Sequence, residues 1–319
     1  MQNYKIVIAE PAGFSQEALE LLRNQGEVFF AKGPHDPVLR DADVVWVRLR
    51  DRIDLDFFSR APNAKIIVTA TTGLNHIDIR EADRRGIQVL SLRGETNFLR
   101  EIRATAEHTV GLMLALLRQI PAAAGHVREG GWDRDLFKGH ELHEKTIGII
   151  GYGRLGSLVA RYLLAFGAKV LATDPNVIGN MLDPYVPLVS LSELLRVSDI
   201  ITLHVNFTEA NVGMIGAREF ARMKHGSWFI NTARGELVDQ DALLLALRSG
   251  WIRGAAIDVV ADEQAQGAAG RLVEFAQRNS NLLITPHIGG CTVESMEKTE
   301  LFMAKKLQAA LTAAAVAHV

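Results

Sequence analysis

The sequence contains a single cysteine, Cys291, which excludes an intramolecular disulfide bond. Such sparse use of cysteine is typical of proteins from a reducing compartment. The sequence also has no run of 18 or more apolar residues, and its first residues, MQNYKIVIAE, lack the basic start and long apolar stretch of a secretion signal. We therefore expect a cytoplasmic protein with no membrane partner.

An excess of charge of one sign is also missing. The chain has 35 Lys and Arg against 37 Asp and Glu, a formal net charge of -2, with no long basic tract. Because nucleic-acid binding depends on a basic surface that contacts phosphates, we expect no nucleic-acid partner. Cys and His residues do not occur at the spacing of metal ligands, so no metal is predicted.

What remains is the composition of a globular chain of 319 residues, 48% of them hydrophobic, and this length favours two domains. Short β-branched runs alternate with helix-like segments, which is typical of parallel sheets covered by helices. In the N-terminal third we predict a helix from Ser15 to Gly26, a helical segment at 76–86, and strands at 5–10, 43–47, 64–70 and 87–92. This third has no glycine-rich phosphate turn, so we do not expect it to hold a nucleotide.

The segment 104–120, ATAEHTVGLMLALLRQI, is apolar around most of a helical circumference, and Pro121 is expected to end the helix. A helix this apolar requires burial on several faces. Periodicity alone does not separate a central core helix from one that also meets a second subunit, so both interpretations stay open.

A second α/β series follows. We predict a helix at 154–166 and strands at 145–150, 168–173, 200–205, 227–232, 255–260 and 282–285. SLSE at 190–193 has the form of a capping box, and Gly250 fits the position after a helix.

The second series opens with a dinucleotide-binding pattern. Gly151, Gly153 and Gly156 form G-x-G-x-x-G at a strand–helix junction, and Asp174 follows 18 residues after Gly156. The first glycine allows the tight turn, the second lets the backbone approach a pyrophosphate, and the third lets the helix pack on the strand. A carboxylate at Asp174 can bind the ribose hydroxyls, which favours NAD; an ordinary glycine turn is the alternative.

Later strands end in residues suited to acid–base chemistry. Arg234 follows an apolar strand, Asp258 ends the next, a loop then carries Asp262 and Glu263, and His287 follows the last strand in ITPHIGG. Open α/β sheets bind ligands at the edge where these residues lie. An arginine there can hold a carboxylate through two parallel N–H bonds, although a surface salt bridge is an equal alternative from this stretch alone.

Taken together, the motifs AEHTVGLMLALLRQIP, EKTIGIIGYGRLG, INTARGELVD, AAIDV and TPHIGG make the sequence similar to the NAD-dependent D-isomer-specific 2-hydroxyacid dehydrogenases, which include phosphoglycerate dehydrogenase. The resemblance implies a Rossmann-type dinucleotide-binding domain at 103–286, inserted into a second, flavodoxin-like α/β substrate domain formed by 1–102 and 287–319. It also implies a homodimer through the helix at 104–120.

The resemblance further implies roles for individual residues. Arg234 would bind the substrate, His287 would be the acid/base, and Glu263 would be the carboxylate paired with it. Oxidation of a 2-hydroxy acid needs a group that takes the hydroxyl proton, which imidazoles in general can do near neutral pH. Thr72 and Gly73 match a loop whose N–H groups bind the substrate carboxylate, unless this loop is a simple turn. The predicted cofactor-binding residues are Gly151, Gly153, Arg154, Leu155, Gly156, Asp174, Val205, Thr232, Ala233, Asp258, Gly289 and Gly290.

The sequence departs from the family pattern in several places. Gln264 and Asn206 stand where proline is usual, and no C-terminal regulatory domain is expected after Val319. The segment 93–104 is longer than the usual linker, and it is interpreted either as a specificity element or as a rigid spacer.

Two arginines, Arg48 and Arg50 in WVRLRDR, occupy alternate positions after a predicted strand and are expected on one side. Arg48 and Arg50 resemble a family position that lies against the substrate phosphate in phosphoglycerate dehydrogenases, and Arg134 resembles a basic position that can reach the cleft; a solvated surface pair is the alternative for Arg48 and Arg50. We therefore expect a substrate with a second anionic group, such as 3-phosphoglycerate.

The sequence thus predicts an oxidoreductase that transfers hydride between NAD(H) and a D-2-hydroxy acid/2-oxo acid pair. One alternative is an NAD-binding corepressor-like or sensor protein on the same fold. Another is a reductase of small 2-oxo acids such as glyoxylate or hydroxypyruvate. A dehydrogenase of formate or phosphite is also considered, but formate enzymes of this fold pair the histidine with glutamine, and Glu263 argues against that option.

Overall fold

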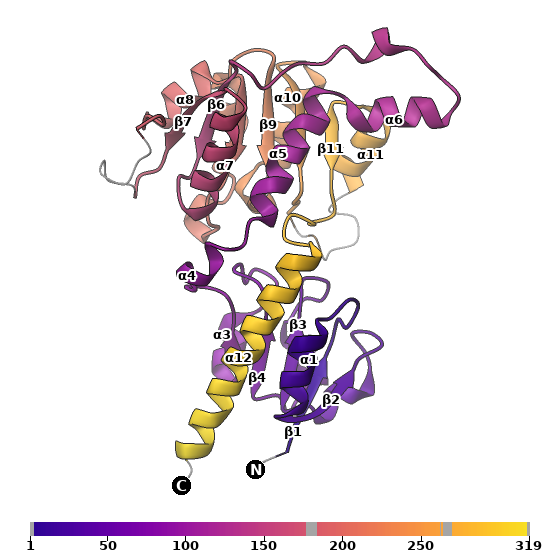
Figure 1. Ribbon diagram of the computed structural model, residues 1–319, viewed down its shortest axis with the longest axis vertical. Helices are drawn as coiled ribbons and strands as arrows, with labels where there is room; N and C mark the ends of the chain where they lie inside the picture. Colours follow the sequence, from indigo (N-terminus) through magenta and orange to yellow (C-terminus); the bar gives the residue numbers. More distant parts are fainter. Residues whose placement is uncertain (1–2, 177–183, 262, 264–269, 318–319) are drawn as a thin grey trace. The chain divides into compact units, whose positions relative to one another are not determined.

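The computed structural model describes residues 3–176, 184–261, 263 and 270–317, and the chain forms two compact units (Figure 1). Unit 1 consists of Met1–Ile102 and Cys291–Val319, and unit 2 of Arg103–Gly290. Each unit has one parallel sheet with helices on both faces, which confirms the predicted α/β fold class. Parallel strands buried on both faces read as nearly continuous apolar runs, as they do in this sequence.

The sheet of unit 1 has the strand order β2-β1-β3-β4-β5, the flavodoxin-like order. Alternate residues of β1 point to opposite faces: Ile6 and Ile8 pack with α1 and α12, whereas Val7 packs with the residues of α2. The strands are β1 (Tyr4–Ile8), β2 (Gly26–Phe30), β3 (Val44–Val47), β4 (Ile66–Thr69) and β5 (Gln88–Leu90). The helices are α1 (Gln16–Arg23), α2 (Leu55–Arg60), α3 (Ile79–Arg84), α4 (Thr96–Leu99) and α12 (Val293–Ala317), with a 3-10 turn η1 (Pro37–Asp41).

The sheet of unit 2 has the order β11-β10-β9-β8-β6-β7. Residues 187–189 extend it beyond β7, because Ala172 exchanges backbone hydrogen bonds with Pro187 and Val189. From β6 the chain therefore adds β7 and residues 187–189 on one side, and then β8 and the later strands on the other side. This reversal of strand order between β6 and β8 is the Rossmann arrangement. The strands are β6 (Thr146–Ile150), β7 (Lys169–Thr173), β8 (Ile200–Leu203), β9 (Ser227–Asn231), β10 (Ile252–Ile257) and β11 (Leu282–Ile284).

Helices cover both faces of this second sheet. They are α5 (Ala104–Leu117), α6 (Ile120–Arg128), α7 (Arg154–Ala165), α8 (Leu191–Val197), α9 (Ala217–Arg222), α10 (Gln240–Arg248) and α11 (Gly270–Arg278), with short 3-10 turns η2 (Arg134–Phe137), η4 (Glu209–Asn211) and η5 (Gly235–Leu237). The core of one face includes α5 and α7, and the core of the other includes α8, α9, α10 and α11.

One predicted helix end was wrong. Helix α5 ends at Leu117, and Gln119 has a left-handed backbone with φ 54° before α6 begins. Pro121 lies in the first turn of α6, where the missing N–H of proline has no helical partner to lose. Two predicted N-caps are confirmed, since the Ser15 hydroxyl accepts the N–H of Ala18 and the Ser190 hydroxyl that of Glu193.

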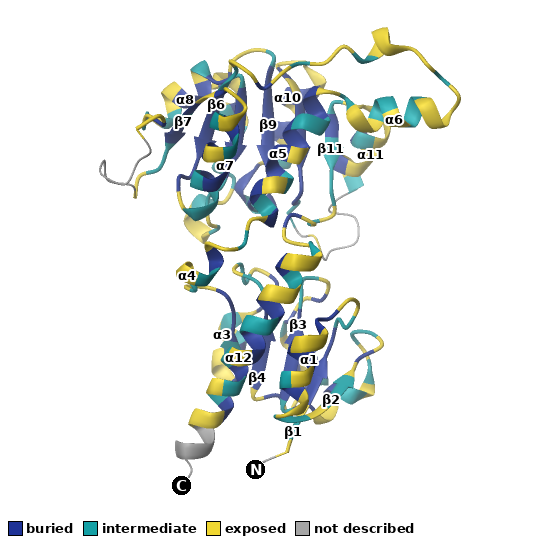
Figure 2. Ribbon diagram, in the orientation of Figure 1, coloured by how far each residue is buried: buried dark blue, intermediate teal, exposed yellow. Residues whose placement is uncertain are grey.

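Burial differs sharply between the two halves of the 104–128 segment (Figure 2). Helix α5 buries eight residues in the core of unit 2, as a central core helix does, whereas α6 has no buried residue. Among the described residues no single helix is long and apolar enough to cross a membrane; Thr96–Leu117 and Ile120–Arg128 meet that test only together, across a bend of 61°.

Candidate functional site

The carboxyl ends of the unit 2 strands bring the predicted residues of this unit to one edge of its sheet. Because all six strands are parallel, the segments that follow them begin at the same edge. This edge holds the glycine turn after β6, Asp174 after β7, Val205 after β8, Thr232, Ala233 and Arg234 after β9, Asp258 after β10 and His287 after β11.

The three glycines of the turn occupy three different environments. Gly151 has φ 92°, and a Cβ there would lie 2.6 Å from the carbonyl oxygen of His204. A Cβ on Gly156 would lie 2.1 Å from the carbonyl oxygen of Gly151, so only glycine allows α7 to start this close to β6. At Gly153, by contrast, a Cβ would have no neighbour within 4 Å, which leaves this backbone open to a ligand.

Asp174 lies directly beside the turn. Its carboxylate accepts the N–H of Tyr152 at 2.9 Å and the N–H of Asn176 at 2.9 Å. Arg154 and Leu155 form the first turn of α7, where burial lowers the pKa of the Arg154 guanidinium from its ordinary value. Arginine is nonetheless fully charged near neutral pH, so the amino end of α7 carries a cation.

A buried asparagine shapes the turn that carries Arg234. The Asn231 side chain, 1% exposed, accepts the N–H of Ala233 at 3.0 Å and donates to the carbonyl of Arg234 at 2.9 Å. A Cβ on Gly235 would lie 1.9 Å from the carbonyl carbon of Val260, so this turn packs against the loop after β10. Burial lowers the pKa of Arg234, and the negative charges of Glu236 and Glu263 oppose that shift.

Glu263 and His287 form a hydrogen-bonded pair. The Nδ1 atom of His287 lies 2.6 Å from Oε2 of Glu263. His287 has φ 54°, an uncommon region for a residue with a Cβ, and such backbones concentrate at functional sites. Its N–H donates to the carbonyl of Asp258 at 2.8 Å and to that of Thr285 at 3.0 Å, which holds the backbone in this conformation. The Nε2 atom is the ring nitrogen that this pairing leaves for a ligand.

Asp258 is only 2% exposed. Its carboxylate connects the end of β10 with α5 and with the segment after β11. It accepts hydrogen bonds from the Thr285 hydroxyl at 2.6 Å, from the N–H groups of Ile288 and Gly289 at 2.9 and 2.7 Å, and interacts with His108 Nε2 at 3.2 Å. Burial alone would raise the pKa of Asp258, but these hydrogen bonds outweigh it and hold the pKa below its ordinary value. The carboxylate is thus buried in its charged form.

The remaining predicted cofactor-binding residues lie on the same edge. The Thr232 hydroxyl lies 2.9 Å from the hydroxyl of Thr109 on α5, and Val205 packs near Gly151. A Cβ on Gly289 would approach Oδ2 of Asp258 to 2.9 Å, whereas a Cβ on Gly290 would have open space.

Sequence reasoning missed Asn231, His108 and Thr285, which position other groups through side-chain hydrogen bonds. The sequence feature that could have indicated these three residues is a polar side chain at the end of an apolar strand or inside an apolar helix. It also missed His204, which bonds to the Thr202 hydroxyl at 2.9 Å and whose pKa burial lowers to about 3. His204 is therefore neutral near pH 7.

In unit 1, Thr72 and Gly73 lie in the loop after β4, at the carboxyl edge of that sheet. The Thr71 hydroxyl donates to the carbonyl of Gly73 at 2.8 Å and so fixes the loop. Within the described ranges, no protein acceptor binds the N–H of Thr72 or Gly73. Both N–H groups are therefore available to an anion.

Arg48 and Arg50 follow β3 at the switch point of the unit 1 sheet, beside β1. Both arginines are already paired within the unit: Arg48 with Glu300 of α12, and Arg50 with Asp51 at 2.8 Å. The Glu10 carboxylate accepts the backbone N–H of Arg48 at 2.8 Å and of Arg50 at 3.1 Å. Burial raises the pKa of Glu10 in spite of these two hydrogen bonds.

Arg134 lies elsewhere in unit 2. It begins η2 in the exposed segment after α6, and the next residues return along the amino ends of the strands, where His140 bonds to Arg253 near the start of β10. The Gly151 turn is at the opposite edge, so Arg134 does not approach the glycine turn of its own unit. Asp262 and the loop from Gln264 to Ala269 lie outside the described residues.

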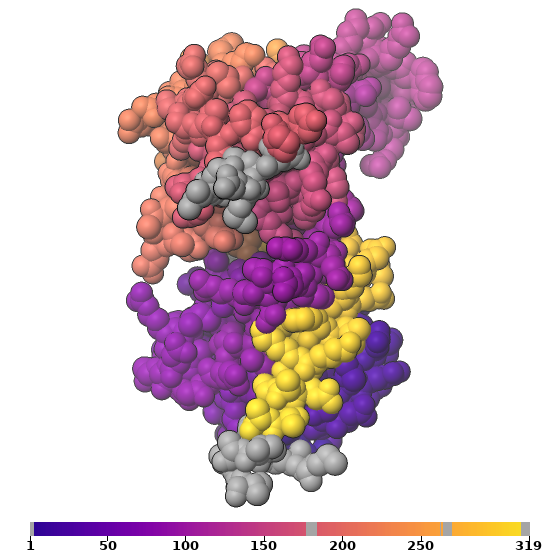
Figure 3. All heavy atoms as spheres, turned by 60° about the vertical axis from the view of Figure 1, so that its left-hand side comes forward, coloured from indigo at the N-terminus to yellow at the C-terminus, as the bar shows by residue number. Residues whose placement is uncertain are grey.

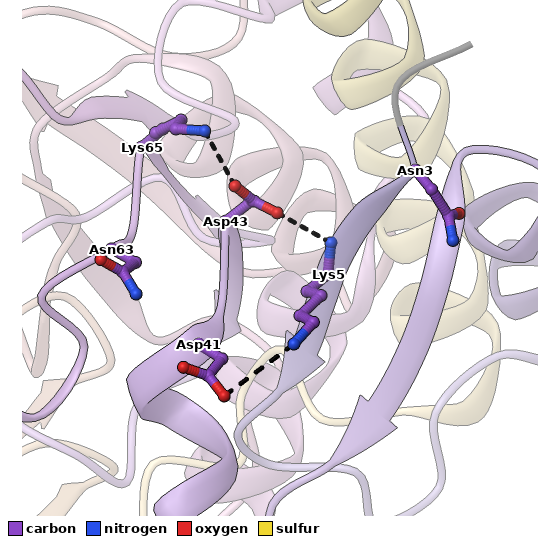
Figure 4. Close-up of a pocket in the computed structure, with 6 residues that line it drawn as sticks. All are labelled: Asn3, Lys5, Asp41, Asp43, Asn63 and Lys65. Atoms are coloured by element: carbon purple, nitrogen blue, oxygen red, sulfur yellow. Dashed lines mark hydrogen bonds and ion pairs between the residues drawn. The ribbon is translucent and has the colours of Figure 1, made fainter.

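A pocket of about 400 Å³ opens at the amino edge of the unit 1 sheet (Figure 4). Its charged side chains pair with one another, as Lys65 does with Asp43 at 2.9 Å and Lys5 with Asp41 at 3.9 Å. It holds none of the predicted site residues. No group of three or more His, Cys, Asp or Glu side chains suited to a metal ion occurs in the part of the chain that the structure describes.

Comparison with known proteins agrees with this geometry. Residues 110–289 match the NAD-binding domain of the D-isomer specific 2-hydroxyacid dehydrogenases. The chain is 37% identical over 295 residues to D-3-phosphoglycerate dehydrogenase of Mycobacterium tuberculosis, covering 91% of this chain but 54% of the relative. The chain therefore spans about half the length of the phosphoglycerate dehydrogenases that it matches.

Two further similarities extend over nearly the whole chain. Glyoxylate reductase of Thermofilum pendens is 36% identical over 96% of this chain and 85% of its own length. The crystal structure of D-lactate dehydrogenase from Aquifex aeolicus, complexed with NAD and lactic acid, superposes with a TM-score of 0.81 at 31% identity, over 97% of this chain and 96% of that one.

The charge of Asp258 should matter more to stability at neutral than at acid pH. A carboxyl whose pKa is lowered by folding stabilises the fold above its unfolded-state pKa of about 3.9, and this contribution is lost as pH falls through the folded-state value. Asp258→Asn should lower the free energy of unfolding by about 1.5–3 kcal/mol at pH 7 and by clearly less at pH 3, measured by urea denaturation. The exposed control Asp83→Asn should change it by less than about 0.5 kcal/mol. Equal losses from Asp258→Asn at both pH values would contradict the charge argument.

Proposed function

As this chain belongs to the D-isomer-specific 2-hydroxyacid dehydrogenase family, we propose that it transfers hydride between NAD(H) and a D-2-hydroxy acid/2-oxo acid pair. The observation that carries the proposal is the gathering of Arg234, Glu263 and His287 at the edge that also holds the glycine turn. Within this group, the 2.6 Å contact between Glu263 and His287 supports the proposal most directly.

The residues present fit the cofactor. The open space at Gly153 lets the pyrophosphate approach the backbone, and the amino end of α7, with Arg154, supplies N–H groups and positive charge to it. Asp174 would accept hydrogen bonds from the adenosine ribose, with Val205, Thr232, Ala233, Gly289 and Gly290 lining the rest. When bound, NAD supplies the hydride acceptor, and NADH the donor.

The chain's own residues handle the proton and the charge of the substrate. His287 Nε2 takes the proton of the substrate hydroxyl during oxidation and returns it to the carbonyl oxygen during reduction. Glu263 on Nδ1 fixes the tautomer and stabilises the protonated ring. Arg234 holds the substrate carboxylate, and as a fixed cation it polarises the carbonyl that forms.

Thr72 and Gly73 of unit 1 have two N–H groups that can bind an anion, and the family resemblance assigns them to the substrate carboxylate. Which 2-hydroxy acid the chain uses as substrate is a separate question. The relatives divide between 3-phosphoglycerate and small acids such as glyoxylate, and lactic acid is bound in the similar crystal structure. Because Arg48 is neutralised within unit 1, the geometry supports a small acid with one anionic group better than a phosphorylated acid.

The direct test is turnover of NADH at 340 nm with a panel of 2-oxo acids: glyoxylate, pyruvate, hydroxypyruvate and 3-phosphohydroxypyruvate. Oxidation of NADH with at least one of them supports the proposal. Tight NADH binding without turnover on any of them would instead favour a sensor or corepressor-like protein.

The catalytic pair generates a pH prediction. Glu263→Gln removes the negative charge next to Nδ1, so protonated His287 is less favoured; kcat should fall, and the acidic limb of the kcat/KM profile for oxidation should move to lower pH. His287→Ala should lose roughly 10² to 10⁴ in kcat. Glu274→Gln on the exposed side of α11 and His35→Ala, an exposed histidine of unit 1, are the matched controls. A wild-type profile for Glu263→Gln would shift attention to Asp262.

Asp174 should select NAD over NADP. If Asp174 binds the adenosine ribose as proposed, its carboxylate would face the 2′-phosphate of NADP, and Thr173, Pro175 and Asn176 supply no cation to offset it. Close contact of like charges costs several kcal/mol, so kcat/KM with NADH should exceed that with NADPH by a factor on the order of 10². Asp174→Asn should narrow the ratio by at least about tenfold. Equal kcat/KM for the two wild-type reactions would rule out this role.

We also propose a homodimer through the 104–120 helix region. The end of α5 leads into an exposed segment with large apolar side chains, including Ile120 at 52%, Val127 at 50% and Trp132 at 90% exposure. Figure 1 shows α6 and the segment that follows it projecting from the rest of unit 2. Apolar groups gathered in one exposed segment are typical of a protein–protein interface.

A single charged substitution in α6 tests whether this region forms the dimer interface. Ile120→Asp places a carboxylate in the first turn of α6, where it suits the helix dipole, but in the proposed interface, where it would be buried. Sedimentation velocity should show a dimer for the wild type and a shift toward monomer for the variant. Leu245→Asp, at 65% exposure on α10, is the control and should stay dimeric. A monomeric wild type at micromolar concentration would exclude this interface.

A further inference from the structure

Arg48 forms an ion pair with a buried carboxylate from a distant part of the chain. Its Nη2 donates to Oε1 of Glu300, and its Nη1 donates to the carbonyl of Ala12 at 2.6 Å. The Arg48 side chain is 18% exposed and that of Glu300 only 2%. The guanidinium therefore has two internal acceptors before any ligand arrives.

Glu300 is held in place from its other side. It lies on α12, which packs along the N-terminal residues of unit 1 in Figure 3. Its Oε2 accepts the N–H of Ser15 at 2.8 Å, and Ser15 is the N-cap of α1, the positive end of that helix. Both carboxylate oxygens thus have donors. A ligand that took Arg48 away would leave a buried carboxylate without its cation, which is strongly unfavourable.

The other charged groups at this switch point also have partners within unit 1. Arg50 donates through Nε and Nη2 to both oxygens of Asp51, and Glu10 receives the backbone N–H groups of Arg48 and Arg50. Two guanidinium groups and three carboxylates therefore occur together at this edge. Open α/β sheets bind ligands at such a switch point, so its charge bears on which ligands are accepted.

We propose that Glu300 is a specificity-determining residue that neutralises Arg48, so that the switch point of unit 1 disfavours a second anionic group on the substrate. The inference rests on the proposed function. It makes the substrate a small 2-hydroxy or 2-oxo acid whose only charge is its carboxylate, with a neutral hydrogen, methyl or hydroxymethyl group at the other end. Arg48 could bind a phosphate, but its charge is already neutralised by Glu300.

The experiment compares two compounds that differ only by a phosphate, hydroxypyruvate and 3-phosphohydroxypyruvate, with NADH. Wild type should have the higher kcat/KM with hydroxypyruvate. Glu300→Gln removes the charge with little change of shape and releases Arg48, so the ratio of phosphorylated to unphosphorylated kcat/KM should rise at least about tenfold, the gain expected from a charge-assisted hydrogen bond. Glu297→Gln, the same change at an exposed position of α12, should leave the ratio unchanged.

A double variant separates release of Arg48 from general loosening of the unit. Arg48→Gln combined with Glu300→Gln should return the ratio to near the wild-type value, because the released cation is gone. Circular dichroism checks folding. Glu300→Ala is the second variant if the buried amide prevents folding, since it brings no new N–H donors.

Binding of inorganic phosphate, measured by titration calorimetry, gives a readout that does not require turnover. Glu300→Gln should bind phosphate at least about tenfold more tightly than wild type, by the same hydrogen bond. If wild type reduces no acid but this difference appears, the proposed function fails, and only the neutralisation of Arg48 by Glu300 is supported. If wild type prefers the phosphorylated compound, or folded Glu300 variants change neither the ratio nor phosphate binding, the inference is overturned while the dehydrogenase function remains.

Discussion

The arrangement at the edge of unit 2 depends on the buried carboxylate of Asp258. Four donors converge on it from α5 and from the segment after β11, and each would be costly to leave unpaired inside the unit. The carbonyl of the same residue accepts the N–H of His287, so the imidazole is positioned by the residue that also connects α5 to the sheet. The proposed acid/base role of His287 would require this kind of fixed support, because a shift of one ångström at the reacting atoms costs much of the rate.

The two sheets place arginines at equivalent edges but treat them differently. Arg234 donates to the carbonyl of Ala233, its own neighbour, and the negative charges that influence it include the carboxylate that pairs with His287. Arg48 donates to the buried carboxylate of Glu300, whose other oxygen accepts a backbone N–H from Ser15. Position on the fold therefore does not define the role of an arginine; its partners do. In the proposed function one guanidinium keeps its charge for a ligand, whereas the other joins α12 to the start of α1 through Glu300.

Much of the fold could be predicted from the sequence because its signals are local. Apolar β-branched runs, the glycine pattern after β6, and the caps at Ser15 and Ser190 all act within a few residues, and the structure places strands and helices there. The failures have physical causes. Strand β2 (Gly26–Phe30) has no buried residue and so lacks a clear apolar signal. Pro121 suits the first turn of a helix as well as the end of one, and only the left-handed Gln119 distinguishes the two.

The candidate site was predictable to the extent that residues at strand ends must meet at one edge. The pairing between side chains was not, because it joins positions far apart in sequence: His108 and Asp258 are separated by 150 residues, and Arg48 and Glu300 by 252. Nothing near WVRLRDR indicates that a glutamate on the last helix neutralises the first arginine. A pattern of residues therefore predicts where charge is placed, whereas the net charge offered to a ligand depends on tertiary contacts. Two chains with the same arginine at this switch point are expected to accept different acids if only one of them has a buried carboxylate beside it.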